Sequence, residues 1–191
     1  RTAVTADMRR KAKVINFGIL YGMGVNALRQ TLGENVTQKE ARSYLDAYFE
    51  TYSTLAAWID TTKAEAKRLG YTTTLFGRRR YFEGFSSPLH FIRAAAERMA
   101  VNAPIQGTQA DLIKRAMVEA DMYIETHKLR SHVELVLQVH DELVYEVDDS
   151  HAEIVAQHIK KIMEHVLPSS ETNGIPLIAA YAVGPHWGAL K

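Results

Sequence analysis

The pattern of apolar and polar residues divides the chain into an N-terminal part that is helical and a C-terminal part that also contains short apolar runs. The first helix is expected to begin near Thr5, whose hydroxyl can cap free backbone N–H groups, and to run to about Tyr21. Gly22 and Gly24 follow directly and allow the chain to stop the helix or to hinge. The pattern therefore predicts one long helix that ends at a pair of glycines.

A second helical stretch is indicated between a capping box and a glycine. Thr37 and Glu40 have the spacing of such a box, Gly70 is the natural end, and Ser53 is a candidate break within the stretch. Residues 71–82 then place apolar and aromatic side chains on both sides of a Gly-Arg-Arg-Arg turn. This arrangement predicts a short basic hairpin.

The middle of the chain predicts two helices separated by a proline. Ser87 and Pro88 form a strong helix start. Pro104 lacks a backbone N–H and is expected to kink or end the helix that follows. A further helix is expected from about residue 108 to residue 127.

Two apolar runs rich in β-branched residues come next. Residues 132–139 and 142–147 are separated only by His140 and Asp141. Strands joined by two residues pair antiparallel, so the sequence predicts a tight hairpin with a polar tip.

The last part of the chain predicts one more helix and one more strand. Ser150 and Glu153 form another capping box, opening a helix that Pro168 closes, and residues 176–183 form a final apolar strand. Because antiparallel strands pack on helices without alternating β–α–β units, the expected fold class is α+β.

Composition narrows the classes of protein that fit. The 191 residues allow one large domain or two small ones, and 47% of them are apolar, as in an ordinary globular core. The absence of cysteine excludes disulfides and Cys-based zinc sites and allows a reducing compartment. No apolar run approaches the ~20 residues that span a bilayer, so no membrane partner is expected. The chain begins with Arg rather than Met, and its natural start is expected upstream.

The net charge of +1 is unevenly distributed. Residues 1–36 carry six basic groups against two acidic ones, a net of +4, whereas residues 133–191 carry three against nine, a net of −6. The first end suits a polyanion, and the second suits metal ions or simply a solvated acidic surface.

Four side chains of the first helix recur at steps of four, namely Arg9, Lys13, Phe17 and Tyr21. On a helix they form one stripe roughly 18 Å long, similar in length to a nucleoside triphosphate. Cationic groups near the helix start suit phosphates, and the aromatic rings beyond them suit a sugar and a base. The spacing alone also fits solvated cations beside aromatic core residues.

Arg98, Asn102 and Gln106 also recur at steps of four. Such side chains suit the hydrogen-bond acceptors that every Watson–Crick pair presents in the minor groove, so they can test pair geometry without reading sequence. Ordinary exposed polar residues would give the same spacing.

His140, Asp141 and Glu142 occupy the tip of the predicted hairpin. Carboxylates projected from a rigid strand end are suitable ligands for Mg²⁺, although Asp is also a favoured turn residue. A two-metal site needs a second carboxylate from another segment, and no upstream candidate stands out.

Four segments in order resemble the motifs of family A DNA polymerases, the family of bacterial DNA polymerase I. Residues 8–22 resemble motif B, which is the fingers helix, and residues 74–81 resemble the family's basic hairpin. Residues 96–114 resemble its long palm helix, and residues 138–143 resemble motif C. The resemblance covers essentially the whole chain and implies a helical fingers subdomain, residues 1–85, followed by the distal part of the palm, residues 86–191.

The resemblance implies roles for the residues of the fingers helix. Arg9 and Lys13 would bind the triphosphate of the incoming dNTP, with Lys13 among the catalytic groups. Phe17 would pack on the sugar and base, and Tyr21 would lie beside the templating base and contact DNA.

The palm residues are assigned by the same resemblance. Arg98, Asn102 and Gln106 would contact the nascent pair and the minor groove of the primer–template DNA. Asp141 would ligate metal with support from Glu142, and His140 would contact the primer terminus next to the bound nucleotide.

The implied function is addition of deoxynucleotides to a primer with Mg²⁺ in a two-metal site. The second aspartate, carried by motif A, is not in this chain. A remaining polymerase segment or a partner chain, carrying motif A and the thumb, is therefore expected. The implied location is cytoplasmic, at the bacterial nucleoid or in a phage-infected cell. Alternatives are the C-terminal chain of a split polymerase, a non-catalytic nucleic-acid-binding module that kept the fold, and a phosphohydrolase using Asp141.

Overall fold

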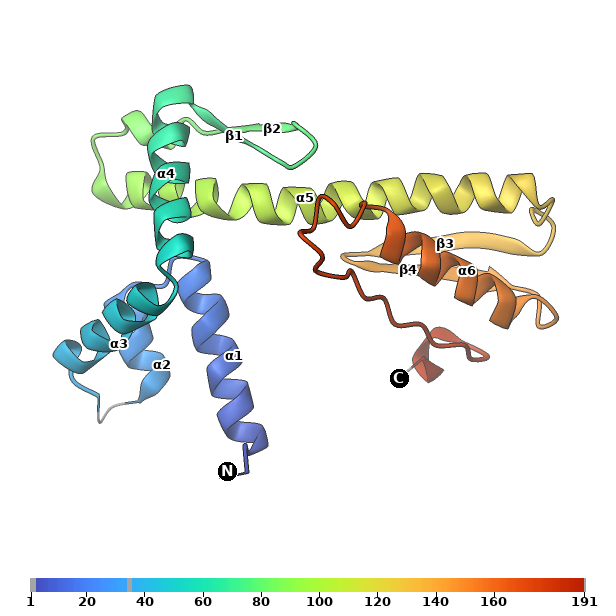
Figure 1. Cartoon of the computed structure of the whole chain (residues 1–191), viewed down its shortest axis with the longest axis horizontal. Coiled ribbons are helices and arrows are strands. Elements are labelled where there is room, and N and C mark those ends of the chain that lie inside the picture. The colour runs from blue at the N-terminus through green and yellow to red at the C-terminus, as the bar shows by residue number, and fades with distance from the viewer. Residues whose placement is uncertain (1–2, 34–35, 191) are drawn as a thin grey trace. The chain divides into compact units, whose positions relative to one another are not determined.

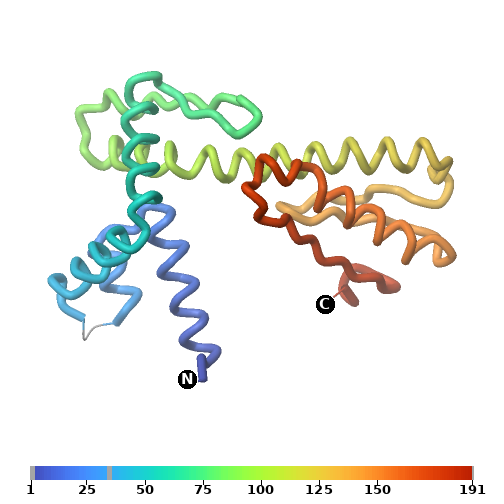
Figure 2. Tube along the Cα trace, in the orientation of Figure 1, coloured from blue at the N-terminus to red at the C-terminus, as the bar shows by residue number. Residues whose placement is uncertain are grey.

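The computed structural model describes residues 3–33 and 36–190 (Figures 1 and 2). The chain divides into two compact units, Arg1–Ile105 and Gln106–Lys191. Helices predominate, and each unit contains one two-stranded antiparallel sheet. This combination confirms the α+β class. The boundary falls further along the chain than the predicted division at residue 85, and the assignment of the parts to fingers and palm stays a prediction.

The N-terminal helix α1 spans Ala6–Leu20 and ends at Tyr21, as predicted (Figure 1). The Thr5 hydroxyl accepts a hydrogen bond of 3.2 Å from the Met8 amide and so caps the helix start. Gly22 has a φ of +85°, in the left-handed region that glycine adopts without steric cost. The first glycine of the pair therefore terminates α1.

A short helix, α2 (Val25–Leu32), follows directly and was not predicted from the sequence. Next comes α3 (Gln38–Thr51), which begins with the predicted capping box of Thr37 and Glu40. The break expected at Ser53 is present, because α4 (Ser53–Leu69) begins there after Tyr52. Helix α4 ends at left-handed Gly70, also as predicted.

Two small apolar clusters hold the first unit together. In one, Ile19 of α1, Leu28 of α2 and Leu45 of α3 are buried against one another. In the other, Phe82 packs with Ala66 of α4 and with buried alanines of α5. These clusters fix the helices whose exposed faces carry the candidate site.

The predicted basic hairpin is confirmed. Strand β1 (Tyr71–Thr73) pairs antiparallel with β2 (Arg79–Tyr81), and Thr72 lies opposite Arg80. The turn contains Gly77 with a φ of +79°. A short 3-10 helix, η1 (Gly84–Ser86), leads to the next helix.

Helix α5 runs without interruption over His90–Thr126, with Pro104 inside it. Of the two outcomes expected at Pro104, an end of the helix is therefore wrong, and the further helix expected from about residue 108 is the continuation of α5. Proline removes one backbone donor and crowds the preceding turn, but the two alanines on its N-terminal side, Ala100 and Ala103, are buried in the core. Tertiary burial on that side outweighs the local penalty, and the helix continues.

The second unit contains the predicted His-Asp hairpin. Strand β3 (Val133–Val139) pairs antiparallel with β4 (Glu142–Val147) through a turn formed by His140 and Asp141. The register shifts by one residue between Leu135 and Leu137, which makes Val136 a β-bulge. Helix α6 (Ala152–His165) follows.

The core of the second unit lies between this hairpin and the two helices. Val133 of β3 packs with Val155 and Ile159 of α6 and with Ala120 and Ile124 of α5. All five side chains are buried. The ends of β3 and α6 that face this core are thus held in fixed positions.

Two predictions for the end of the chain are wrong. Ser150 and Glu153 do not form a capping box, since the N-cap residue of α6 is His151, which makes no side-chain capping hydrogen bond. The Glu153 carboxylate accepts from Gln157 and Tyr181 instead. Residues 176–183 are not a strand. The part of the chain that the structure describes offers them no pairing partner, and the Ala179 amide donates to the Glu164 carboxylate at 3.1 Å.

The end of the chain contains one more element, the 3-10 helix η2 (Trp187–Ala189). No helix among the described residues combines the length and the apolar character that crossing a membrane requires.

Candidate functional site

The two faces of α1 have different surroundings. Ile15 and Ile19 pack toward α2 and α3, whereas Arg9, Lys13 and Phe17 are exposed to solvent. The Phe17 side chain is 44% exposed, so the interpretation of this ring as a core residue is excluded. An aromatic ring held on the surface beside cationic groups is available to a ligand.

Three of the side chains predicted to form the stripe, those of Lys13, Phe17 and Tyr21, lie next to one another in sequence order. The Lys13 ammonium lies 5.9 Å from the centre of the Phe17 ring. The rings of Phe17 and Tyr21 are stacked, with centres 6.2 Å apart and planes inclined by 13°. Three of the four predicted residues thus form a continuous surface of one ammonium and two parallel rings.

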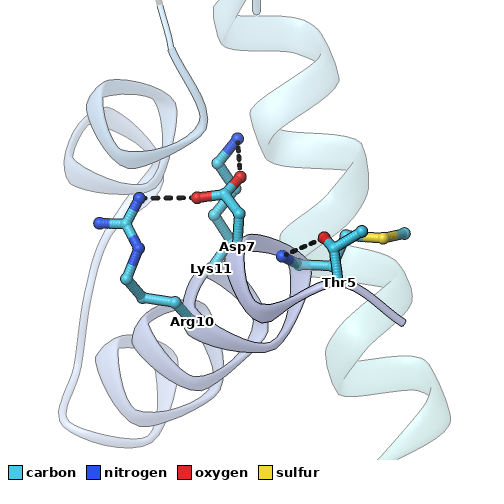
Figure 3. A network of polar contacts seen from close by, with 5 residues as sticks. Thr5, Asp7, Arg10 and Lys11 are labelled. Carbon is cyan, nitrogen blue, oxygen red and sulfur yellow. Dashed lines mark hydrogen bonds and ion pairs between the residues drawn. The ribbon is translucent and has the colours of Figure 1, made fainter. Parts of the chain in front are cut away.

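Acidic Asp7 distinguishes the basic residues of α1 from one another. Figure 3 shows its carboxylate between Arg10 Nη2, at 2.7 Å, and Lys11 Nζ, at 3.0 Å. Hydrogen bonds from these two partners lower the pKa of the Asp7 carboxyl below its usual value, and the hydrogen bond from Arg10 has the larger effect. Within residues 3–33 and 36–190, Arg9 and Lys13 make no ion pair. Their charges therefore remain available for an anion.

The end of α1 forms a shallow groove with α5. Tyr21, Gly22 and Arg98 are among the residues that line it. A Cβ atom at Gly22 would lie 2.7 Å from Cγ of Arg98, so the absence of a side chain at Gly22 lets Arg98 approach the helix end. The structure thereby brings together Tyr21 and Arg98, two residues predicted to contact DNA.

We expect Gly22→Ala to destabilise the protein by about 1–2 kcal/mol, the scale of forcing an L-residue into the left-handed region. The new Cβ would also displace Arg98. The free energy of unfolding in urea measures the effect. Gly24→Ala is the matched control, because Gly24 has a φ of −84° and open space around its Cα. Equal destabilisation by the two substitutions would contradict this prediction.

The other predicted minor-groove residues lie further along α5. Asn102 is partly buried, and its Oδ1 atom accepts no hydrogen bond from any described residue. Unsatisfied acceptors of this kind are uncommon, so a donor from outside the described residues is expected there. Gln106 is exposed and is the first residue of the second unit.

The tip of the β3–β4 hairpin presents its polar side chains to solvent. His140, Asp141 and Glu142 are all exposed, and Glu142 begins β4 opposite Val139. His140 has a φ of +54°, which is uncommon for a residue with a side chain. Gln138 Nε2 donates to the His140 carbonyl at 2.7 Å and so holds the turn. The two adjacent carboxylates project from a paired strand end.

Comparisons with known proteins match nearly the whole chain to one protein family. The sequence profile described as DNA polymerase family A matches residues 1–189. The chain belongs to DNA polymerase family A. The thermostable DNA polymerase I of Thermus aquaticus is 44% identical over 191 residues, which are all of this chain and 22% of that protein. DNA polymerase I of Bacillus subtilis (strain 168) is 42% identical over 184 residues, 96% of this chain and 20% of that protein.

A solved structure of the family has the same fold. The POL domain of Pol1 from M. smegmatis, in complex with DNA primer-template and dNTP, matches with a TM-score of 0.79 at 36% sequence identity. The match covers 86% of this chain and 28% of that one. The chain spans about a fifth of the length of the curated family A relatives described above.

The predicted site residues fall into two groups. The first unit contains Arg9, Lys13, Phe17, Tyr21, Arg98 and Asn102, and among them Tyr21 and Arg98 line one groove. The second unit contains Gln106 and the three adjacent residues His140, Asp141 and Glu142.

Sequence reasoning missed a further group of polar residues at the other end of the β3–β4 hairpin. His132, Asp148 and His151 lie close together there. The signal that could have found part of this group is the predicted hairpin itself. Counting strand partners outward from the turn at residues 140–141 brings His132 close to Asp148.

Proposed function

We propose that this chain forms the nucleotide-binding helix and one part of the metal site of a DNA-templated DNA polymerase. The observation that carries the proposal is the row along α1 and its C-cap, in which the Lys13 ammonium is followed by the nearly parallel rings of Phe17 and Tyr21. Phosphates, sugar and base follow one another in a nucleotide in the same order.

The cations of α1 are proposed to hold the triphosphate of a dNTP. Lys13 and Arg9 have no acidic partner in the part of the chain that the structure describes, whereas Arg10 and Lys11 are occupied by Asp7. A phosphate binding to Lys13 and Arg9 displaces no existing ion pair. Lys13 is proposed to act in catalysis as well, by compensating charge on the transferring phosphoryl group.

The aromatic residues are proposed to orient the nucleotide. Phe17 offers a ring face to the sugar and base, and Tyr21 carries the stacked surface on toward the templating base. Arg98 lines the groove beside Tyr21 and is proposed to contact the minor groove of the primer–template, together with Asn102 and Gln106.

The hairpin tip fits a hard divalent cation. Members of family A use divalent metal ions, and the exposed carboxylates of Asp141 and Glu142 supply the oxygen ligands that Mg²⁺ prefers. We assign Asp141 as the direct ligand and Glu142 as its support. Metal ions held by Asp141, with support from Glu142, and by the missing aspartate would supply Lewis-acid activation of the primer 3′-hydroxyl and charge compensation for the leaving pyrophosphate. His140 is proposed to orient the primer terminus and the nucleotide.

The proposed partners are primer–template DNA, dNTP, and a remaining polymerase segment or partner chain that supplies motif A and the thumb. Two adjacent carboxylates leave most positions around a Mg²⁺ ion to other groups, so the second aspartate must come from that segment. Because the similar proteins named above are bacterial, the proposed place of action is the bacterial cytoplasm, at the nucleoid.

Primer extension tests the proposal. The full-length protein, or residues 1–191 combined with a polypeptide that bears motif A and the thumb, is expected to extend a primer in template order with added Mg²⁺. Residues 1–191 alone are expected to give no extension. DNA binding without extension by the full-length protein would favour a non-catalytic module. Release of phosphate from dNTP without a primer would favour a phosphohydrolase.

A further inference from the structure

A group of three potential metal ligands lies at the base of the β3–β4 hairpin. One ligand atom from each of His132, Asp148 and His151 lies within 4.8 Å of the other two. His132 Nδ1 is 2.6 Å from Asp148 Oδ2, and the two imidazole rings are stacked with centres 4.6 Å apart. Two imidazoles and a carboxylate are a donor set typical of transition metals rather than of Mg²⁺.

The backbone fixes the three residues relative to one another. His132 directly precedes β3, and Asp148 directly follows β4. The Asp148 amide donates to the His132 carbonyl at 2.9 Å, and the His151 amide donates to the Asp148 carbonyl at 2.8 Å. Two backbone hydrogen bonds thus hold the main chain of these three residues together, whatever their side chains do.

The bulge at Val136 decides which acidic residue takes part. Toward the tip the pairing is Leu137 with Val144, and toward the base it is Val133 with Val147, one residue out of phase. If Val136 were paired and the register of the tip continued to the base, His132 would lie opposite Asp149 rather than Asp148. Because side chains alternate between the two faces of a strand, this shift also determines which face carries the carboxylate.

The core beneath the group is rigid. Val133, next to His132, is 3% exposed, and Val155, one helical turn after His151, is 1% exposed. The His132 side chain is 39% exposed and that of Asp148 is 57% exposed. A buried base below accessible side chains lets the donor groups rotate toward an ion while their backbone stays in place.

Charge around the group favours a cation. Glu134 and Glu146 lie opposite each other in the hairpin, next to the pair of Val133 and Val147, and Asp149 follows Asp148. Arg130, the nearest basic residue along the chain, is itself paired with Asp121 and Glu125. No cation within the described residues is paired with Asp148 other than His132 in its protonated form.

We propose that His132, Asp148 and His151 form a binding site for a borderline divalent transition-metal ion such as Zn²⁺. Three protein ligands leave a fourth position of a tetrahedral ion to water or to an outside group. The donor atoms need only small movements, because ligands of such an ion lie about 3–4 Å apart at metal–ligand distances of about 2.0–2.2 Å. Ser150, whose hydroxyl is 3.0 Å from His151 Nδ1, orients the His151 ring.

The site is separate from the carboxylates at the tip of the same hairpin. The seven residues of β3 place its two ends about 20 Å apart at a rise of about 3.3 Å per residue. An ion at the base would therefore clamp the start of β3 to the turn before α6 and would not take part in the chemistry proposed for Asp141. The inference does not depend on the proposed polymerase function.

Calorimetric titration of the full-length protein with ZnCl₂ in excess Mg²⁺ tests the site. The Mg²⁺ occupies hard carboxylate sites, so Zn²⁺ reports on nitrogen ligands. We expect a saturable site whose affinity falls at least about tenfold in His132→Gln and in His151→Gln, the scale on which metal sites respond to altered ligation. His165→Gln is the matched control, since His165 is an exposed histidine at the other end of α6.

Far-UV circular dichroism before titration establishes that each variant is folded. If His132→Gln is not folded, His151→Gln at the half-buried N-cap position of α6 decides the result alone. Unchanged Zn²⁺ affinity in folded His151→Gln, or an equal loss in His165→Gln, would overturn the proposal. In that case the group is a hydrogen-bonded pair with a stacked ring.

Discussion

Lys13→Ala is expected to slow nucleotide incorporation by the full-length polymerase roughly 10²–10³-fold, the scale of removing one preorganised electrostatic stabiliser. The Lys13 ammonium lies 5.9 Å from the Phe17 ring and has no acidic partner among the described residues. In the proposed site, its charge would therefore act on the triphosphate without competition from an acidic partner. Single-turnover incorporation measured over a range of dNTP concentrations separates weaker binding from a slower chemical step.

Lys11→Ala is the control for Lys13→Ala. Lys11 is on the same helix with a similarly exposed side chain, but its ammonium is paired with Asp7 at 3.0 Å. Surface ion pairs of this kind contribute little, so incorporation should change by less than about fivefold. If the two substitutions slow the reaction equally, the effect is one of general positive charge and Lys13 has no specific place at the triphosphate.

Asp141→Asn is expected to abolish most primer extension, with a loss of more than about 10³-fold, because the substitution removes a charged oxygen ligand from the proposed metal site. Asn keeps the size of the side chain and suits the turn equally well, so the hairpin should remain folded. Steady-state extension over a range of Mg²⁺ concentrations is the measurement. A partial rescue by Mn²⁺ would be consistent with weakened metal binding.

Glu146→Gln is the control for Asp141→Asn. Glu146 is an exposed carboxylate on β4, the strand that begins beside Asp141, and it lies opposite Glu134 rather than at the tip. Loss of its charge relieves a repulsion between like charges and should leave extension unchanged. Normal extension by Asp141→Asn would remove this residue from the reaction, whatever the control shows.

Features with a strong local signal were predicted correctly from the sequence. The hydroxyls of Thr5 and Thr37 cap the helices that they were expected to cap, and Gly70 ends α4 in the left-handed conformation. The turn at His140 and Asp141 joins two strands, as the two-residue spacing required. In each case the signal and the structure depend on the same few neighbouring residues.

Features that depend on tertiary packing were not predicted. Helix α2 has only eight residues and would be marginal alone, and it is held by Leu28, which is 1% exposed. Pro104 was expected to kink or end a helix, and the helix does not end there but continues to Thr126. The strand expected at residues 176–183 did not form, because a strand needs a pairing partner that its own sequence cannot specify.

In the candidate site, too, the sequence predicted the local spacing of residues but not the contacts between their side chains. The periodic spacing of Arg9, Lys13, Phe17 and Tyr21 predicted one stripe, and the contacts from Lys13 to Tyr21 agree with it. The role of Asp7 in occupying Arg10 and Lys11 was not anticipated, because four basic side chains in one short segment look equivalent in sequence. Only the side-chain geometry distinguishes the available cations from the paired ones.

The bulge at Val136 is a residue that the hairpin could lose during evolution without a change at either end. If Val136 were removed, Leu135 would still lie opposite Tyr145 and Leu137 opposite Val144, so a regular ladder would join the same partners. His132 would still lie opposite Asp148, and the tip that carries Asp141 would keep its turn. A lineage could thus lose the bulge through a single-codon deletion and keep both the group at the hairpin base and the residues proposed for nucleotide addition.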